Sequence, residues 1–391
     1  MSAKRYTMLM LLGAALMLAA AAATNRVVDP FWYYRDIEIE GFNTVKPRFA
    51  RYERHVKPQL LARERPQAIV LGSSISEIGF DTNDPSLTAG GALKGYNFAF
   101  AGAPWPLVQC HLSYARAVTD LKRVVLGVHL QALPLVDCSN RMPEVKDFSE
   151  TKLLFSLQAL NQSLRTVLEQ GRGRSSHTRE GRYLYARDDG AVAARFRERF
   201  LGLAHTNPRC TLGSVPATPP PSRDIAPAFP GSAAGLDLSG LRAAIRQTRS
   251  SGIELRIFVY PLHALAWELD LICGRGTERW AALAAMAQVI AEEAPDGGVQ
   301  LWMFYDYNDV TGESIAGPPV YWQDSEHFNY EMGALMLADL FGGAAEGKLG
   351  RRVTAGGAAD AYRAFLASRD RYIATHPRFY GELRATLAPL R

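Results

Sequence analysis

A serine that directly follows a short apolar run is the first residue in the chain whose setting suggests chemistry. The stretch Ile69–Asp81 reads IVLGSSISEIGFD, and Gly72 within it permits the tight backbone needed to expose Ser74 at the end of a buried strand. A serine hydroxyl is a poor nucleophile until an adjacent base removes its proton. Nucleophilic chemistry at Ser74 therefore requires a histidine from elsewhere in the sequence.

His327 is the one of the eight histidines that is best supplied with a partner carboxylate. Asp324 lies three residues before it in WQDSEHFNYEMGALML (Trp322–Leu337), just ahead of a helix that we expect to start near Asn329. On a tight turn, this spacing lets the carboxylate hydrogen-bond one imidazole nitrogen while the other nitrogen faces the serine. Ser74, Asp324 and His327 are therefore the candidate catalytic triad.

The elements that must position these residues are indicated by apolar runs with helical periodicity between them. The expected strands are Ala68–Leu71, Tyr96–Phe100, Arg123–Val128, Leu255–Tyr260 and Gln300–Tyr305. The expected helices are Leu107–Asp120, Leu241–Ser250, Arg279–Glu293, Tyr330–Phe341 and Ala358–Ala374. This alternation predicts an α/β fold with a doubly wound, flavodoxin-like parallel sheet of about five strands. Reactive groups in such sheets gather at the carboxyl ends of the strands, where Ser74, Gly102 and His129 all fall.

The N-terminus has the features of an export signal. Lys4 and Arg5 precede the uncharged stretch Tyr6–Asn25, which is rich in Leu, Met and Ala. This stretch is long enough to span a bilayer, and it also ends in small residues that suit signal-peptidase cleavage. Residues 1–25 are thus either a cleaved signal peptide or an anchor that associates with the membrane through residues 6–25. Both interpretations place the chain from Arg26 onward in the periplasm or an equivalent extracytoplasmic space.

We expect residues 26–391 to form one domain with an insertion at about 135–240. Within the insertion, Gly171–Arg199 is dense in arginine and predicts a helical cap near the site, whereas Val215–Gly235 is rich in Pro, Ala, Gly and Ser and predicts a loop. The arginines form either a solvated basic face or a groove for an anionic glycan or for phosphate groups. A net charge of only +5, with no zinc-finger or RNA-binding motif, argues against nucleic acid as a partner.

The four cysteines are Cys110, Cys138, Cys210 and Cys273. An even number of cysteines in an exported chain suits one or two disulfides, and three full pairings are open. Four buried, unpaired cysteines are the alternative.

The order of these motifs resembles that of the SGNH/GDSL hydrolase superfamily. Gly72-Ser73-Ser74 is similar to the nucleophile block, and Asp324 with His327 is similar to the final block. Gly102, in YNFAFAGAP, resembles the glycine whose backbone N–H lines the oxyanion hole. The resemblance covers about Pro66–Val128 and Leu255–Phe341.

The third block departs from the family pattern. Where the family has Gly-x-Asn, this chain has Gly127-Val128-His129, which removes a standard oxyanion donor. His129 either donates in place of the asparagine or packs in the core. Two other polar residues are substrate-binding candidates, with structural alternatives: Asn97, which also suits a turn cap, and His263, which also suits packing.

The resemblance implies an acyl-serine mechanism that needs no metal or organic cofactor. In it, Ser74 attacks an ester, His327 is the general base, and the N–H groups of Ser74 and Gly102 stabilise the oxyanion. With its export signal, the chain looks like SGNH-type proteins of bacterial envelopes, which attach or remove acyl groups, often acetyl, on exopolysaccharides and other surface glycans. We therefore expect a serine esterase or O-acyltransferase that works on an envelope glycan beside a membrane-bound acyltransferase or a polysaccharide export partner. The alternative is a non-catalytic glycan-binding protein or an accessory subunit of a membrane-bound assembly.

Overall fold

The chain forms two compact units. The computed structural model describes residues 2–146, 149–185, 194–200, 215–226, 228–343 and 347–387. Unit 1 comprises Met1–Arg65 and Ser139–Tyr185, and unit 2 comprises Pro66–Cys138 and Ala186–Arg391. The sequence analysis expected one domain with an insertion from residue 26, and did not anticipate this division into two units. The first half of the insertion packs with the N-terminal segment in a core of its own, and the second half belongs to unit 2.

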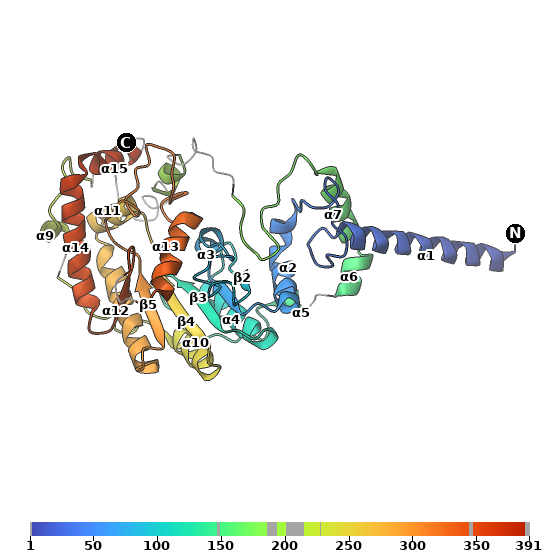
Figure 1. Ribbon diagram of the computed structural model, residues 1–391, viewed down its shortest axis with the longest axis horizontal. Coiled ribbons are helices and arrows are strands. Elements are labelled where there is room, and N and C mark those ends of the chain that lie inside the picture. Colours follow the sequence, from blue (N-terminus) through green and yellow to red (C-terminus); the bar gives the residue numbers. More distant parts are fainter. Residues whose placement is uncertain are drawn as a thin grey trace. The chain divides into compact units, whose positions relative to one another are not determined.

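Unit 2 is built on a six-stranded sheet with the order β2-β1-β3-β4-β5-β6 (Figure 1). The strands are β1 (Ala68–Leu71), β2 (Gly95–Asn97), β3 (Arg123–Val128), β4 (Glu254–Val259), β5 (Val299–Met303) and β6 (Arg351–Val353). β1 to β5 are parallel, and β6 pairs antiparallel with β5. The predicted α/β class and parallel sheet are thus present, with one antiparallel edge strand that the sequence analysis missed.

Helices lie on both faces of this sheet. α4 (Trp105–Val118), α10 (Ser239–Ser250) and α12 (Gly276–Glu293) are neighbours on one face, whereas α3 (Ser74–Gly79) and α13 (Tyr330–Phe341) contact each other on the opposite face (Figure 1). Because strands β1, β3 and β4 are covered in this way, their apolar side chains are buried on both sides.

A second group of helices closes unit 2 beyond β6. It consists of α9 (Ser222–Ile225), α11 (Ala264–Ile272), α14 (Ala358–Thr375) and α15 (Pro377–Leu387). Arg369 of α14 and Glu268 of α11 form an ion pair in this layer, with side chains only 1% and 0% exposed. The Arg369 Nε donates to the Glu268 Oε2 at 2.7 Å, and the Tyr307 hydroxyl donates to the same oxygen at 3.1 Å. The carboxylate is therefore fully hydrogen-bonded although it lies away from water.

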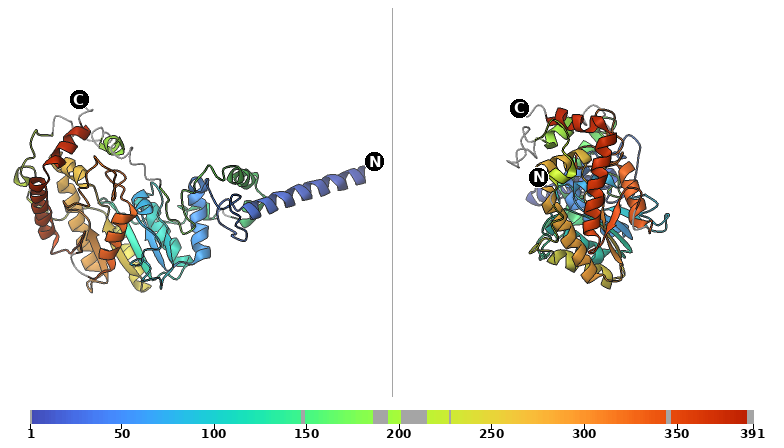
Figure 2. Two further views of the ribbon diagram at one scale, coloured as in Figure 1. Left: turned by 45° about the horizontal axis from the view of Figure 1, so that its top comes forward. Right: turned by 90° about the vertical axis from the view of Figure 1, so that its left-hand side faces the viewer.

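Unit 1 contains α1 (Ala3–Val28), α2 (Phe49–Glu64), α5 (Pro143–Lys146), α6 (Glu150–Phe155) and α7 (Leu157–Leu168). Among the described residues, α1 is the one helix long and apolar enough to cross a membrane. It extends away from the rest of unit 1 (Figure 2). The aromatic residues Phe31, Trp32 and Tyr34, which follow α1, are buried. The ring centroids of Trp32 and Phe49 lie 5.3 Å apart.

The end of α1 is held by two buried charged residues. The Asp29 carboxylate accepts the backbone N–H groups of Tyr33, Tyr34 and Arg35, and the Lys46 ammonium donates to the Val28 carbonyl at 2.8 Å. Burial raises the pKa of Asp29 to about 6, although the positive charge of Lys46 and the backbone hydrogen bonds oppose this rise. α1 and the segment that follows it are thus built into unit 1.

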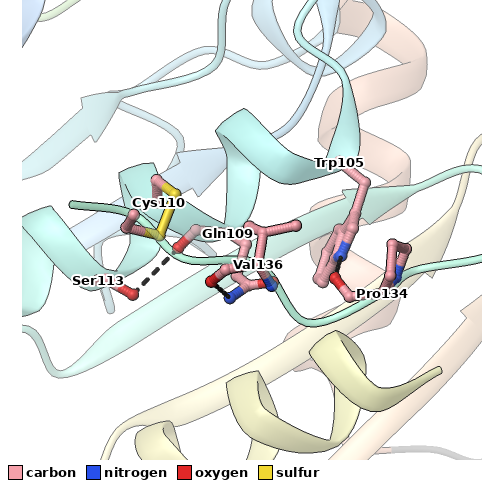
Figure 3. The surroundings of a disulfide bond; sticks show 7 residues. Trp105, Gln109, Cys110, Ser113, Pro134 and Val136 are labelled. Carbon is pink, nitrogen blue, oxygen red and sulfur yellow. Dashed lines mark hydrogen bonds between the residues drawn. A yellow bond between two sulfur atoms is a disulfide. The ribbon is translucent and has the colours of Figure 1, made fainter. Parts of the chain in front are cut away.

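A disulfide joins Cys110 of α4 to Cys138 at the end of the first part of unit 2, with Cα atoms 5.3 Å apart (Figure 3). The segment before Cys138 is also bonded to α4, since the Trp105 indole donates to the Pro134 carbonyl at 2.9 Å and the Gln109 amide donates to the Val136 carbonyl at 3.2 Å. Cys273 is disulfide-bonded as well. Cys210 lies outside the described residues.

Candidate active site

The turn between β1 and α3 presents Ser74 at the carboxyl end of β1, where the chain reverses into the helix. Gly72 has a φ of +147°, and a Cβ there would lie 2.3 Å from both the Ser76 Oγ and the Tyr260 hydroxyl. The Tyr260 hydroxyl accepts the backbone N–H of Ser73 at 2.7 Å. Glycine is therefore required at position 72 for its conformation and for the space that Tyr260 occupies.

The three predicted triad residues lie within hydrogen-bonding distance of one another. The Ser74 Oγ is 2.9 Å from the His327 Nε2, and the His327 Nδ1 is 2.8 Å from the Asp324 Oδ2. The other carboxylate oxygen, Oδ1, accepts the backbone N–H groups of Glu326 and His327 at 2.8 and 2.9 Å. Asp324 is thus fixed by the turn that carries the histidine, and it fixes the orientation of the imidazole in turn.

The electrostatics of Asp324 set the tautomer of His327. Burial would raise the pKa of Asp324, but the hydrogen bond and the charge of His327, together with the two backbone N–H groups, hold this pKa below its usual value. The carboxylate is therefore ionised at neutral pH and accepts the proton on Nδ1. Nε2 is then left to accept the proton of the serine hydroxyl.

Two backbone N–H groups, those of Ser74 and Gly102, are the candidates for an oxyanion hole. Ser74 is the first residue of α3, so its N–H has no acceptor within the helix. Gly102, with a φ of +63°, lies in the exposed turn after β2. Within the described part of the chain, neither of these N–H groups donates to a backbone acceptor. Both remain able to bind a ligand oxygen.

His129 is exposed directly after β3, and the alternative in which it packs in the core is wrong. Its ring packs edge-on against Tyr260, with centroids 4.5 Å apart. Partial removal from water at this contact, and the positive charge of Arg279, lower the pKa of His129. With Ala103 and Trp105, these rings line a cavity of about 10 Å³. This is roughly the space needed for one water molecule.

Asn97 and His263 are fully buried, so their assignment as substrate-binding residues is corrected. The Asn97 amide donates to the carbonyls of Ser76 and Glu77, each at 3.1 Å, and thereby ties β2 to α3. The His263 Nδ1 accepts the N–H of Leu265, and Nε2 lies 2.8 Å from the carbonyl oxygen of Glu313. Burial lowers the pKa of His263 to about 3, so the ring is neutral. Both residues have structural roles.

Two features of the site were not predicted from the sequence. Tyr260 was treated only as the end of a strand, although Tyr260-Pro261 at a strand terminus could have drawn attention to it. The second feature is the helix at residues 194–200. The Arg199 Nε of this helix lies 3.7 Å from the Asp324 Oδ2, and its Nη1 lies 3.9 Å from the Glu326 Oε2. Arg195 on the same helix donates to the Gln323 carbonyl at 2.9 Å.

The predicted cap is therefore only partly correct. Residues 194–200 lie against the loop that carries Asp324 and His327, whereas residues 171–185 belong to unit 1. Residues 186–193 fall outside the described residues. Arg199 has 47% of its side chain exposed and is ion-paired with Asp324 and Glu326, so its guanidinium group lies beside the triad and is partly open to solvent.

The arrangement suits activation of a serine nucleophile, because it contains a serine, a histidine in contact with it and a carboxylate that orients the histidine. No protein-family model matches this chain, and no curated protein matches it. A functional assignment therefore depends on the geometry of the site.

Proposed function

We propose that this protein is an exported serine-dependent acyltransferase or esterase with an SGNH-hydrolase-like site. The observation that carries the proposal is the pair of contacts at His327, 2.9 Å from the Ser74 Oγ through one nitrogen and 2.8 Å from Asp324 through the other. This linear arrangement of nucleophile, base and carboxylate is what activation of a serine at neutral pH requires.

In the proposed mechanism, the Ser74 Oγ attacks the carbonyl carbon of an ester while the His327 Nε2 takes the hydroxyl proton. The N–H groups of Ser74 and Gly102 bind the oxyanion of the tetrahedral intermediate. Collapse of this intermediate breaks the ester bond, and His327 returns the proton to the departing alcohol. A second hydroxyl, from a sugar or from water, then attacks acyl-Ser74 with His327 again as base, which releases the acylated sugar or the free acid.

We assign the substrate to the class of acylated envelope glycans, with a short acyl group such as acetyl. The likeness to SGNH-type proteins of bacterial envelopes, which often transfer or remove acetyl groups, favours a short acyl chain. The export signal favours an extracytoplasmic glycan, handled together with a membrane-bound acyltransferase or a polysaccharide export partner. Arg199, at the rim beside Asp324, would favour an anionic glycan.

A fluorophosphonate probe tests the proposal, because it forms a covalent bond only with an activated serine. The wild-type protein should be labelled and the Ser74→Ala variant should not. Asp324→Asn should slow labelling by about 100-fold or more, since the imidazole then loses its orientation. Labelling should be measured on intact protein by mass and located by peptide mapping.

The adjacent serine supplies a matched control. The Ser73 Oγ is buried and has no hydrogen-bond partner within the described residues, so Ser73→Ala should be labelled at nearly the wild-type rate. A folded wild-type protein that is not labelled would exclude the catalytic assignment. It would favour the non-catalytic alternative, in which the same cleft only binds a glycan.

A further inference from the structure

The helix α7 of unit 1 has its apolar face turned outward. Leu157, Leu164 and Leu168 have exposed fractions of 81%, 52% and 77%. Their spacing of seven and four residues places them on one stripe of the helix. An amphipathic helix of a water-soluble domain normally buries such a stripe. Nothing in the described part of the chain covers these leucines.

The opposite face of α7 is polar or small, and it is the buried one. Ala159, Gln162, Ser163 and Thr166 are all buried, and α7 packs against α1. The Ser163 hydroxyl donates to the Asn25 side-chain oxygen at 2.9 Å, while the Asn25 amide donates to the Leu154 carbonyl at 2.7 Å. α6 and α7 thus both contact α1 near its C-terminal end (Figure 1).

The length of α1 gives the depth at which α7 lies. Tyr6–Asn25 is uncharged and helical, and 20 residues of helix span about 30 Å, which is roughly the thickness of the hydrocarbon core of a bilayer. With Tyr6 at one boundary of the hydrocarbon, Asn25 lies at the other. Because Ser163 bonds directly to Asn25, a bilayer crossed by α1 in this way would have its surface at the level of α7.

We propose that α7 lies in the interface of the lipid bilayer that α1 crosses, with Leu157, Leu164 and Leu168 inserted among the lipid chains. The composition of α7 suits this position, because Arg165 is its one charged residue. Arg165 and Lys152 of α6 are exposed and would face anionic headgroups. The proposal implies that α1 is a retained anchor and not a cleaved signal, and it does not depend on the chemistry of Ser74.

Depth measurements on the full-length protein in lipid vesicles test this arrangement. Cys110, Cys138 and Cys273 are in disulfides. A single cysteine introduced at position 157, 164 or 168 can therefore carry a polarity-sensitive fluorophore. The wild-type chain, treated with the same fluorophore, measures the background labelling. We expect blue-shifted emission at all three positions and quenching by lipids with a spin label on the acyl chain. Leu157 and Leu168 lie about 16 Å apart along the helix, so equal depth at both positions would show that α7 lies in the plane of the membrane.

Two controls make the result decisive. A fluorophore at Gln158, an exposed polar residue of α7, should be quenched by aqueous iodide instead. A fluorophore at Leu12 of α1 should be quenched by the lipid spin label. If Leu12 is quenched and the three leucine positions are not, the placement of α7 is wrong although α1 spans the bilayer. If the leucine positions are protected only in native membranes and not in vesicles of purified protein, a protein partner covers them and the lipid proposal also fails.

Discussion

Replacing Tyr260 by phenylalanine removes the hydroxyl that accepts the backbone N–H of Ser73 in the nucleophile turn. In the wild-type protein, the Tyr260 hydroxyl accepts the N–H of Ser73 at 2.7 Å and lies 3.4 Å from the Ser76 Oγ. Phenylalanine keeps the ring and its packing against His129. The substitution therefore isolates the effect of the hydroxyl on the turn that presents Ser74.

The expected cost comes from the buried N–H left without a partner. Such a group destabilises a protein by about 1–3 kcal/mol. For a domain of roughly 150–250 residues, each kcal/mol corresponds to a fall in Tm of about 2–4 °C. Because the freed turn directly precedes Ser74, a displacement of about 1 Å at its Oγ would slow fluorophosphonate labelling by up to about 100-fold.

Thermal unfolding and labelling rates should be measured together, with Tyr380→Phe as the matched control. The Tyr380 hydroxyl is buried in α15 and has no hydrogen-bond partner in the described residues, so its removal should not lower the Tm and should leave the labelling rate unchanged. If Tyr260→Phe also unfolds within about 0.5 kcal/mol of the wild type and is labelled at the full rate, then the tyrosine does not position the nucleophile turn. A Tm loss without a change in labelling would restrict its role to stability.

Two further substitutions test the buried charges of each unit. Burial raises the pKa of Asp29 from 3.8 to about 6. Between these two pH values the folded protein binds more protons than the unfolded chain. The contribution of Asp29 to the free energy of unfolding therefore falls by roughly 3 kcal/mol as the pH rises through this window. The Asp29→Asn variant cannot titrate, and urea unfolding from pH 4 to pH 7 should show that this part of the slope is missing; an unchanged slope would contradict the assignment. In unit 2, Arg369→Met should cost about 3–5 kcal/mol because it leaves the Glu268 carboxylate buried without its partner, whereas the double variant with Glu268→Leu should recover most of that loss. Equal losses in the single and double variants would mean that the ion pair is not coupled.

Much of the sheet could be predicted because its signals are local. β1 and β3 have the predicted bounds, since each is a run of buried aliphatic residues that ends near a glycine. β6 was missed because its sequence, RRV, contains no apolar run and pairs antiparallel at the edge of the sheet. The division into two units could not be predicted either, since it depends on contacts between residues 1–65 and 139–185, which are far apart in the sequence.

The site shows the same distinction between local and distant signals. Asp324 and His327 lie on one turn, so their spacing alone predicted their hydrogen bond. The contacts of Tyr260 could not be predicted, because they depend on space left by Gly127 in β3 and by Gly72 in the turn after β1. A Cβ at Gly127 would lie 2.4 Å from the Tyr260 ring, and a Cβ at Gly72 would lie 2.3 Å from its hydroxyl. Sequence periodicity likewise identified no outward-facing stripe on α7, since periodicity shows that a helix is amphipathic but not which face is covered.

The disulfide between Cys110 and Cys138 also has a mechanical consequence. Cys138 is the last residue of unit 2 before the chain enters unit 1 at Ser139. If α1 anchors unit 1 in a membrane, tension that reaches residue 139 passes through the disulfide into α4, and the hydrogen bonds at Pro134 and Val136 carry part of it (Figure 3). Residues 129–133 lie between β3 and the segment that is bonded to α4, so they would not carry this tension. At this crossing, one of those between the units, the disulfide thus diverts tension from the end of β3 to α4, and a reducing environment would remove that protection.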